Sequence, residues 1–429
     1  MLSKCYTFGC GQGATKAMIQ AIKEGVLDPN YCRIVNSTSK DIPKEYLDKA
    51  IVISEDPDAG CGKVREAAKV LMLQYIKDNP NAINDLIDET IDYVNIITTT
   101  EGASGSGASV ILAKYISQSI EVPVNIILIT GFESDTRGLQ NTINYFKDLN
   151  GADYTIRIVS NKKYLENSVT TFAAEEKANH EVASVLAMVQ GKDIVSSDHN
   201  IDNTDHYRII TTPGLMFTGE VNLSNKKYKN VDQSNKDLAD MVDYSSSLDF
   251  TPSATKIGIY MNISDNNLEN IDTTFEVLKK KLCGSNSVPE LFIHRQDDDR
   301  FYPFIRVIAS GIDLPTEEVQ QMYNKYKTSV ESVDNRKSDF FDALDNMDTT
   351  QVKTSSSTPT QNNDDFFKNC ENEVKSEEAE NVLGRRKRRR SMSSSNNNIT
   401  STTTNGNKEN KFRTPVNKEY SEDTITKSC

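Results

Sequence analysis

The first 190 residues alternate between short β-type runs and amphipathic helical patterns, and this alternation restricts the possible folds more than any other feature. The β-type runs cover residues 4–8, 32–35, 50–53, 93–99, 124–130 and 154–159, and the helical patterns cover residues 14–23, 63–77, 108–118 and 139–149. Such alternation predicts an α/β, Rossmann-like domain whose parallel sheet carries helices on both faces. In a sheet of this kind, ligands bind beyond the carboxyl ends of the strands.

A central helix and a second, smaller α/β unit are expected next. Residues 172–189 form a helical pattern with one apolar face, made by Val182, Val185, Leu186 and Val189, as in a buried helix. Residues 256–262 and 301–310 are strand-like, and residues 274–282 are helical. A further helical pattern covers residues 316–347, directly after Pro315, where proline is tolerated. One face of it carries Val319, Met322, Tyr326, Val330 and Val333.

The composition changes after residue 349, where serine, threonine and asparagine dominate. Only 37% of the whole chain is hydrophobic, which is below the usual share of a globular protein. A disordered tail over residues 349–429 is therefore expected, because it cannot bury enough apolar surface to offset the loss of conformational entropy. The tail contains a basic run: Arg385, Arg386, Lys387, Arg388, Arg389 and Arg390.

Charge, cysteine usage and hydropathy argue against several classes of protein. The formal net charge of −13 argues against a protein that coats nucleic acid, although it leaves room for a local basic patch. The seven cysteines include no CxxC pair and are too scattered for a disulfide framework, as expected of reduced thiols in a cytosol. We find neither an apolar run long enough to span a bilayer nor an apolar leader. A cytoplasmic protein without membrane contact is the simplest interpretation.

Two glycine-rich segments stand where predicted strands end and helices begin. The first contains Gly9, Gly11, Gln12 and Gly13, and the second contains Gly102, Ser104, Gly105, Ser106 and Gly107. Glycines let the backbone approach a phosphate closely, its N–H groups and the positive end of the next helix attract the anion, and serine hydroxyls add donors. Either segment alone could equally be a tight turn, but two in one sheet favour a phosphate site. The GxxxxGK[ST] pattern is absent, which excludes a P-loop NTPase.

These segments resemble the tubulin/FtsZ superfamily in collinear order over about residues 4–313. IITTTEGASGSGASVILAKYI is similar to the family's strand, GGGTGSG-type loop and helix, and GCGQG is similar to its first nucleotide loop. Further similar segments are the Asn-Ser-Thr sequence at Asn36, AGCGKVREAA with Gly60 and Gly62, VSNKKYL with Asn161, KANHEVASVL with Asn179, and NIDNTD with Asn200, Asp202 and Asp205. KIGIYMNIS and FIRVIASGID resemble strands of the family's second domain. The TubZ-like branch of plasmids and phages is the most similar, because of the GQG and GCGK segments, the long C-terminal helix and the basic tail.

The resemblance implies a GTPase that binds GTP or GDP with Mg²⁺ and forms head-to-tail filaments with itself. Residues 1–191 would be the GTP-binding domain including the central helix, residues 192–313 the catalytic loop and activation domain, and residues 314–348 a C-terminal helix. The nucleotide would contact both glycine-rich loops together with Asn36, Gly60, Gly62, Asn161 and Asn179, the last of these on guanine. Asn200, Asp202 and Asp205 of the next subunit would close over the γ-phosphate and position the attacking water, so that hydrolysis depends on assembly.

Several positions depart from the family pattern. The stretch that ends in Lys16 stands where the family often has an asparagine that touches guanine. Glu101 and Ala103 stand where glycines are common, and a carboxylate this close to a phosphate would repel it by about 1 kcal/mol or more unless it turns away. Ser104 replaces the usual threonine and keeps the hydroxyl. Weaker nucleotide binding is the expected consequence.

Other residues have less specific interpretations. By composition alone, NIDNTD is a solvated loop, and only the collinear flanking motifs favour catalysis. No zinc-ligand spacing connects the histidines, so we interpret them as surface residues: His180, His199, His206 and His294. Cys10 and Cys61 lie in the predicted phosphate loops and are expected to pack there, since no base partner is identifiable.

The basic run has three interpretations: a sequence like a nuclear-localisation signal, a solvated charge run, or a contact with DNA or a DNA-bound adaptor. Likeness to TubZ-like proteins favours the third, and with it a role in moving or positioning plasmid or phage DNA. The alternatives are an FtsZ-type cell-division ring protein, a non-polymerising nucleotide-binding regulatory module, and a filament protein that no longer hydrolyses GTP.

Overall fold

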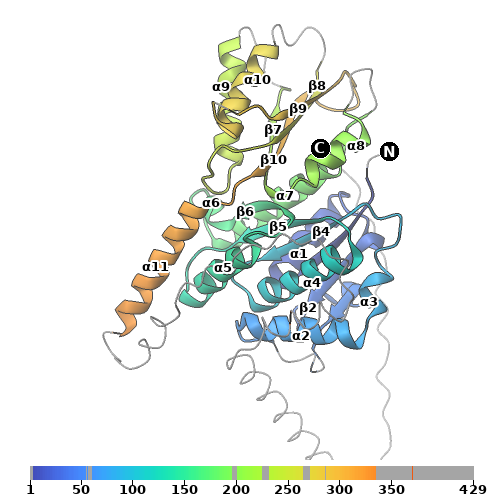
Figure 1. Ribbon diagram of the computed structural model, residues 1–429, viewed down its shortest axis with the longest axis vertical. Helices are drawn as coiled ribbons and strands as arrows, with labels where there is room; N and C mark the ends of the chain where they lie inside the picture. Colours follow the sequence, from blue (N-terminus) through green and yellow to red (C-terminus); the bar gives the residue numbers. More distant parts are fainter. Residues whose placement is uncertain are drawn as a thin grey trace, which may run out of the picture. The chain divides into compact units, whose positions relative to one another are not determined.

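The computed structural model describes residues 3–54, 56, 60–195, 201–224, 231–263, 271–285, 287–334 and 370. All of them belong to one compact unit, Met1–Arg386. A ten-stranded sheet runs through this unit in the order β3-β2-β1-β4-β5-β6-β7-β10-β8-β9 (Figure 1). The predicted disordered tail with its basic run lies outside the described residues, apart from Cys370.

The first part of the sheet is parallel, as the alternating pattern predicts. Its strands are β1 (Cys5–Cys10), β2 (Cys32–Asn36), β3 (Ala50–Val52), β4 (Tyr93–Thr99), β5 (Val124–Thr130) and β6 (Tyr154–Ser160). The helices between and after them are α1 (Gln12–Lys23), α2 (Arg65–Asp78), α3 (Asn81–Asn84), α4 (Ser109–Tyr115), α5 (Thr136–Leu149), α6 (Asn161–Leu165) and α7 (Thr171–Val189). Two short 3-10 segments, η1 (Pro29–Tyr31) and η2 (Lys44–Lys49), flank β2. Cys10 pairs with Val35 on one side and Thr98 on the other, so the ends of these three strands lie level with one another.

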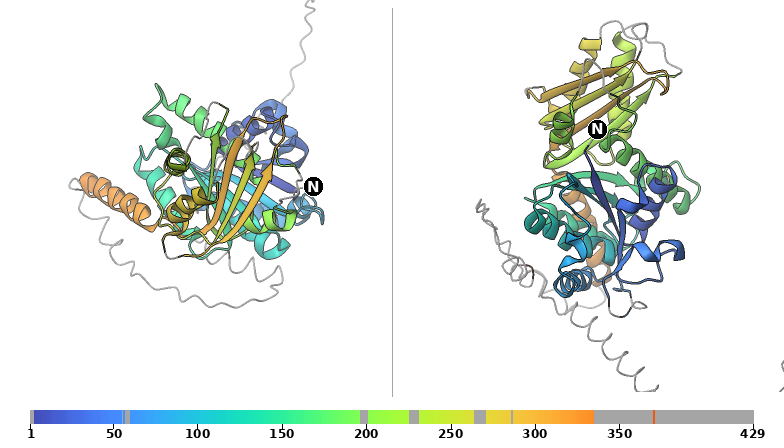
Figure 2. Two further views of the ribbon diagram at one scale, coloured as in Figure 1. Left: turned by 90° about the horizontal axis from the view of Figure 1, so that it is seen from above. Right: turned by 90° about the vertical axis from the view of Figure 1, so that its right-hand side faces the viewer.

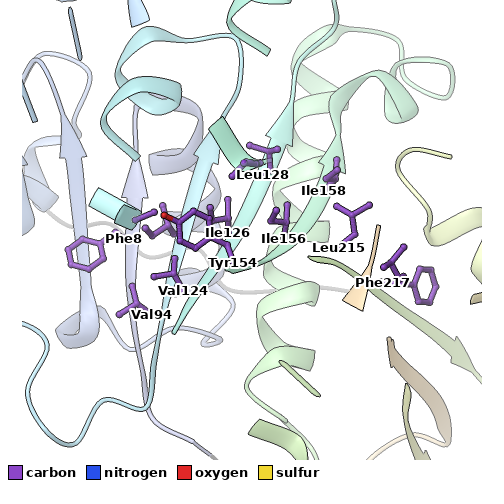
Figure 3. Close-up of a cluster of buried hydrophobic side chains, with 14 of the residues drawn as sticks. Phe8, Val94, Val124, Ile126, Leu128, Tyr154, Ile156, Ile158, Leu215 and Phe217 are labelled. Carbon is purple, nitrogen blue, oxygen red and sulfur yellow. The ribbon is translucent and has the colours of Figure 1, made fainter. Parts of the chain in front are cut away.

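Helices cover both faces of this parallel sheet (Figure 2). Successive strand residues point to opposite faces, so strands buried on both faces are mostly apolar. Ile96 packs with α2, α4 and α5 on one face, whereas Ile97 packs with α1 and α7 on the other. The cluster on the first face continues from Phe8 across the sheet to Phe217 (Figure 3). The carboxyl ends of the strands are therefore anchored by a core on each side.

The second part of the sheet is mixed. It contains β7 (Gly214–Asn222), β8 (Lys256–Asn262), β9 (Glu290–Gln296) and β10 (Phe304–Ile312), with helices α8 (Asn203–Ile210), α9 (Val231–Ser245) and α10 (Ile271–Cys283). Strand β7 joins the first part by parallel pairing with β6, and β10 runs antiparallel to both β7 and β8. This is the predicted smaller α/β unit, but the sequence patterns identify only β8, β10 and α10. They miss β7, β9, α8 and α9.

Some elements differ from their predicted bounds. The expected helix over 108–118 consists of α4 between two π-helical segments, η3 (Ser104–Ala108) and η4 (Ile116–Ile120). The expected helix over 316–347 is α11 (Thr316–Asp334), and residues 335–347 lie outside the described part. Helix α11 packs on α5, with Met322 buried (Figure 1). In the described part of the chain, no helix combines the length and apolarity needed to cross a membrane.

Candidate functional site

A cleft of about 520 Å³ opens beyond the carboxyl ends of β1, β2, β4, β5 and β6. This volume lies within the range of about 300–1,000 Å³ that is typical of small-molecule sites. The predicted nucleotide-binding residues that line it are Gly11, Gln12, Gly13, Asn36, Gly60, Gly62, Gly102, Ser104, Gly105, Asn161 and Asn179. The fold thus brings together loops that are up to 168 residues apart in sequence, from Gly11 to Asn179.

The other three predicted residues, Gly9, Ser106 and Gly107, are not among the lining residues. Gly9 lies inside β1, where a Cβ would come 3.2 Å from the sulfur of Met18. Gly107 lies against the backbone of Arg65, so closely that any side chain there would collide with it. The Ser106 hydroxyl donates to the Gly102 carbonyl oxygen at 2.5 Å. In this structure these three residues shape the loops from behind the cleft.

The two glycine-rich loops touch each other through their backbones. Gly11 has a φ of 84°, in the left-handed region, and a Cβ there would lie 2.8 Å from the backbone nitrogen of Gly105. A Cβ at Gly105 would lie 2.8 Å from Thr99 Oγ1 and 2.9 Å from the Cys10 carbonyl oxygen. Only glycine fits this contact without displacing backbone. Helix α1 begins directly after Gly11, and the first N–H groups of a helix have no partner within it. The part of the cleft lined by residues 11–13 therefore suits an anion.

Polar groups after β2 face the second loop. The hydroxyls of Ser37 and Ser104 are hydrogen-bonded at 2.7 Å. Asn36 Oδ1 accepts from the Ser37 N–H at 2.8 Å, whereas Asn36 Nδ2 is buried and has no hydrogen-bond partner among the described residues. A buried donor left unpaired is unfavourable by about 1–3 kcal/mol. An oxygen of a bound nucleotide would satisfy this donor, so the residues present fit such a ligand.

Glu101 is turned aside and held by the loop after β5. Its Oε1 accepts from the backbone N–H of Glu133 at 2.8 Å. The carboxylate lies so close to Gly131 that a side chain there would overlap it, and Gly138 also lies against its stem. Burial raises the pKa of Glu101, although the backbone N–H groups of Glu133 and Phe132 oppose the shift. The expected repulsion of phosphate is thereby reduced but not removed, because Glu101 still lines the cleft.

Lys16, the last residue of the stretch where the family often has an asparagine, lies on the cleft wall with Glu175 and Asn179. Its Nζ is 3.2 Å from Glu175 Oε2. Glu175 and Asn179 are one turn apart on α7, so a cation, a carboxylate and an amide form one end of the cleft. Sequence patterns do not single out Glu175 or the other lining residues Asp41 and Phe132. Phe132 could be found from its place just after β5, but the others depend on the fold.

Asp202 and Asp205 lie at the start of a helix instead of in an irregular loop. Asp202 is the residue before α8, and its Oδ1 accepts from the Asp205 N–H at 2.8 Å, which caps the helix. Asp205 is in the first turn, where a carboxylate is favoured by the helix dipole. Neither residue lines the cleft of its own chain. Asn200, the third predicted catalytic residue, lies outside the described residues.

The surface interpretation of the histidines is wrong for two of them. His206 and His294 are each only 1% exposed, because α8 and β9 pack into the core on the α7 side of the sheet. His206 Nδ1 is 2.7 Å from the Tyr260 hydroxyl, and its Nε2 is 2.8 Å from the Val189 carbonyl oxygen. His180 is exposed, as predicted, and contacts Glu24. His199 lies outside the described residues.

Cys10 and Cys61 are buried, as expected of packing residues. Burial raises the pKa of Cys10, which disfavours the reactive thiolate. Cys61 lines the cleft. Over the described ranges of the chain, we find no group of three or more His, Cys, Asp or Glu side chains that could hold a metal ion.

Comparison with known proteins identifies the fold. No family model and no curated protein sequence matches this chain. Among solved structures, CetZ2 from Haloferax volcanii in a GTPγS-bound protofilament is 16% identical, with a TM-score of 0.61 over 76% of this chain and 99% of that one. TubZ of Clostridium botulinum phage c-st is 17% identical, with a TM-score of 0.57 over 77% and 100%. The GTPγS-form protofilament of TubZ from Bacillus thuringiensis serovar israelensis is 15% identical, with a TM-score of 0.59 over 78% and 94%.

At such low identity the likeness shows the fold alone. The predicted fold class is confirmed: the described chain has the α/β fold of tubulin/FtsZ-like proteins. CetZ and TubZ structures match about equally well, so the likeness does not select the TubZ-like branch.

Proposed function

We propose that this chain is a GTP-dependent, filament-forming cytoskeletal GTPase. The observation that carries the proposal is the backbone contact between the Gly11 and Gly105 loops, beside the unpaired donor of Asn36, at the carboxyl ends of β1, β2 and β4. Protofilaments of CetZ2 and TubZ with GTPγS have the same fold, which supports both the nucleotide and self-association.

In this proposal the cleft residues have distinct tasks. The backbone N–H groups of residues 11–13 and 102–107 hold the phosphates, together with the hydroxyls of Ser37 and Ser104. Mg²⁺, bound with the nucleotide, would offset phosphate charge. Asn161 and the cleft end formed by Lys16, Glu175 and Asn179 contact the sugar and the base. Guanine presents N–H donors on one edge and a carbonyl acceptor beside them, which suits a carboxylate and a cation side by side.

The acidic residues act on the nucleotide of a neighbouring subunit. Asp202 and Asp205 lie at the start of α8, outside their own cleft, so they can reach a nucleotide only if subunits stack with α8 over the neighbour's cleft. There they would orient and polarise the attacking water as general-base-type groups. Asn200 would contribute to the same surface. Because the site is complete only after assembly, hydrolysis would depend on the filament and then weaken it.

The proposal also assigns a task to each part of the chain and a cellular role to the filament. Residues 1–191 would bind nucleotide, residues 192–313 would carry the catalytic and activation parts, residues 314–348 the C-terminal helix, and residues 349–429 the tail. The filament would move plasmid or phage DNA, which the basic run contacts directly or through an adaptor. The likeness to TubZ of a phage supports this role. It is tested by deleting residues 349–429, which is expected to abolish binding to DNA or adaptor while leaving polymerisation intact.

The GTPase itself is tested by turnover as a function of protein concentration, with pelleting in parallel. Turnover per subunit is expected to rise above a critical concentration and to be lost in Asp205→Ala, which still pellets with GTP. Asp299→Ala, at an exposed carboxylate on another loop, is the control. A protein that binds GTP without light scattering or pelleting would be a non-polymerising module.

Doping separates a shared site from a site within one chain. Asp205→Ala protein is added to the wild type at constant total concentration. If the neighbour supplies Asp205, turnover per wild-type subunit falls as more clefts meet a defective neighbour. If turnover per wild-type subunit stays constant, each chain uses its own Asp205 and the shared-site proposal is wrong.

A further inference from the structure

His206 occupies a buried junction between three elements. It follows Asp205 directly on α8, yet it is only 1% exposed, whereas Asp202 is exposed at the helix start. Its ring lies between the last residue of α7, Val189, and Tyr260 of β8. The rings of His206 and Tyr260 meet edge to face, with centroids 5.7 Å apart and an angle of 78° between their planes.

The hydrogen bonds determine which nitrogen carries the proton. The Val189 carbonyl oxygen can only accept, so His206 Nε2 must be the donor at 2.8 Å. Nδ1 of the neutral ring is then an acceptor, and the Tyr260 hydroxyl donates to it at 2.7 Å. Burial lowers the pKa of His206, which favours this neutral form. Both ring nitrogens are therefore hydrogen-bonded: Nε2 donates to the Val189 carbonyl oxygen, and Nδ1 accepts from the Tyr260 hydroxyl.

The junction connects the cleft with the acidic helix. Helix α7 lines the cleft with Glu175 and Asn179 and ends at Val189, where His206 donates. Asp202 caps the start of α8, and Asp205 lies in its first turn. The last turn of α8 is anchored in the core by Ile209 and Ile210, which are both fully buried. Asp205 and His206 are adjacent, so a rotation of α8 that broke the histidine contacts would also redirect the Asp205 carboxylate.

We propose that His206 is a positioning residue, which holds α8 at a set angle to α7 and β8 so that Asp202 and Asp205 meet the neighbouring subunit's nucleotide. This inference rests on the proposed shared-site GTPase. His206 itself would touch no nucleotide, because it is buried on the inner side of α8 and does not line the cleft. Its removal should therefore lower turnover in the filament without changing the affinity of the monomer for GTP.

The test compares four variants of the full chain. His206→Leu keeps the bulk but leaves the Val189 carbonyl and the Tyr260 hydroxyl unpaired. Tyr260→Phe keeps the ring packing and removes one hydrogen bond, and it serves if His206→Leu does not fold. His206→Gln retains an amide N–H and an oxygen that can replace both contacts in part. His180→Leu is the control, since it removes an exposed histidine of α7.

Three quantities are measured: GTP affinity below the critical concentration, the fraction pelleted, and turnover per pelleted subunit. His206→Leu is expected to bind GTP within about twofold of wild type and to lose about tenfold or more in turnover per pelleted subunit, as small misplacements of reacting groups do. Tyr260→Phe should show a smaller loss, His206→Gln a partial rescue, and His180→Leu no change.

The outcomes separate this inference from the proposed function. If the wild type hydrolyses GTP in filaments and His206→Leu or Tyr260→Phe does so equally fast, the positioning role is wrong, even where either variant melts at a lower temperature. If both variants lose GTP affinity in the monomer, His206 supports the cleft and does not position α8, which also overturns the inference. If the wild type shows no assembly-dependent turnover, the proposed function itself fails, and the positioning role fails with it.

Discussion

Glu101 Oε1 accepts a hydrogen bond from the backbone N–H of Glu133 at 2.8 Å, which ties the second glycine-rich loop to the loop after β5. The side chain lies in a space that exists because Gly131 and Gly138 carry no Cβ. Asn141 of α5 also contacts this loop, because its Nδ2 donates a hydrogen bond to the Glu101 carbonyl oxygen at 3.0 Å. These donors hold the carboxylate to one side of the proposed nucleotide cleft.

Glu101→Gln is expected to tighten binding of GTP by about two- to fivefold. The substitution keeps an acceptor oxygen for the Glu133 N–H but removes a negative charge near the phosphates, an effect of about 1 kcal/mol or less at partly exposed sites. Affinity is measured by titration of a fluorescent GTP analogue below the critical concentration. Glu176→Gln, an exposed carboxylate of α7, is the control. Weaker binding by Glu101→Gln would mean that the hydrogen bond between the Glu101 carboxylate and the Glu133 N–H favours GTP binding more than the negative charge opposes it.

Gly105→Ala is expected to lower GTP affinity by at least about tenfold and the free energy of unfolding by about 1–3 kcal/mol. Its Cβ would lie 2.9 Å from the Cys10 carbonyl oxygen and 3.0 Å from that of Thr99, and backbone atoms cannot swing away as a flexible side chain can. Gly60→Ala is the control for the free energy of unfolding, because its Cβ would meet no protein atom within 4 Å. An affinity of Gly105→Ala equal to that of the wild type, in the same titration, would show that the contact between the loops is not required.

Asp202 caps α8, and the role in hydrolysis proposed for it can be separated from this cap by different substitutions. Asp202→Ala removes the cap of α8 and should lower the free energy of unfolding by about 1 kcal/mol as well as turnover. Asp202→Asn keeps an oxygen that can accept from the Asp205 N–H, so stability should stay within a few tenths of a kcal/mol. Its turnover in filaments should nevertheless fall, because the charge is gone. Denaturant unfolding and GTP turnover are measured on both. Full turnover in Asp202→Asn would leave Asp202 as a cap only.

The contact of α11 with the loop after β5 should depend on pH. Burial alone would raise the pKa of Glu133, but Lys325, at 2.7 Å, and Lys162, at 3.2 Å, hold it below 4.5. A carboxyl with a depressed folded-state pKa stabilises the fold above its unfolded pKa, and this contribution is lost as pH falls through the folded value. Lys325→Ala should therefore destabilise by about 1 kcal/mol or less at neutral pH.

The difference between Lys325→Ala and wild type should shrink as the pH falls below 4.5, and it should also shrink in high salt. Lys236→Ala removes the same charge from an exposed lysine of α9 and serves as the control. Denaturant midpoints at neutral and acid pH provide the measurement. A difference that is constant across this pH range would show that Lys325 acts through packing and not through the Glu133 charge.

Strong local patterns predict the first half of the fold and most of the cleft. Strands β4, β5 and β6 are rich in valine and isoleucine, and the glycines of both loops stand directly after strands, so their positions follow from parallel-sheet geometry. Strands β7 and β9 and helix α9 are mixed in polarity, and their pairing and packing partners are remote in sequence. Their local signals are therefore too weak to predict them.

The amino-acid sequence alone determined the alternating elements, and with them a parallel sheet whose carboxyl edge gathers two glycine-rich loops, because hydrophobic periodicity and glycine act over a few residues. Only the tertiary structure decided that Glu101 turns aside, that Asp202 and Asp205 begin a helix outside their own cleft, and that His206 is buried. Two of these depend on atoms from distant elements: Glu101 on the Glu133 N–H, and His206 on the Val189 carbonyl oxygen and the Tyr260 hydroxyl. A side chain's direction is set by the partners that satisfy it once water is excluded, and local sequence does not contain those partners.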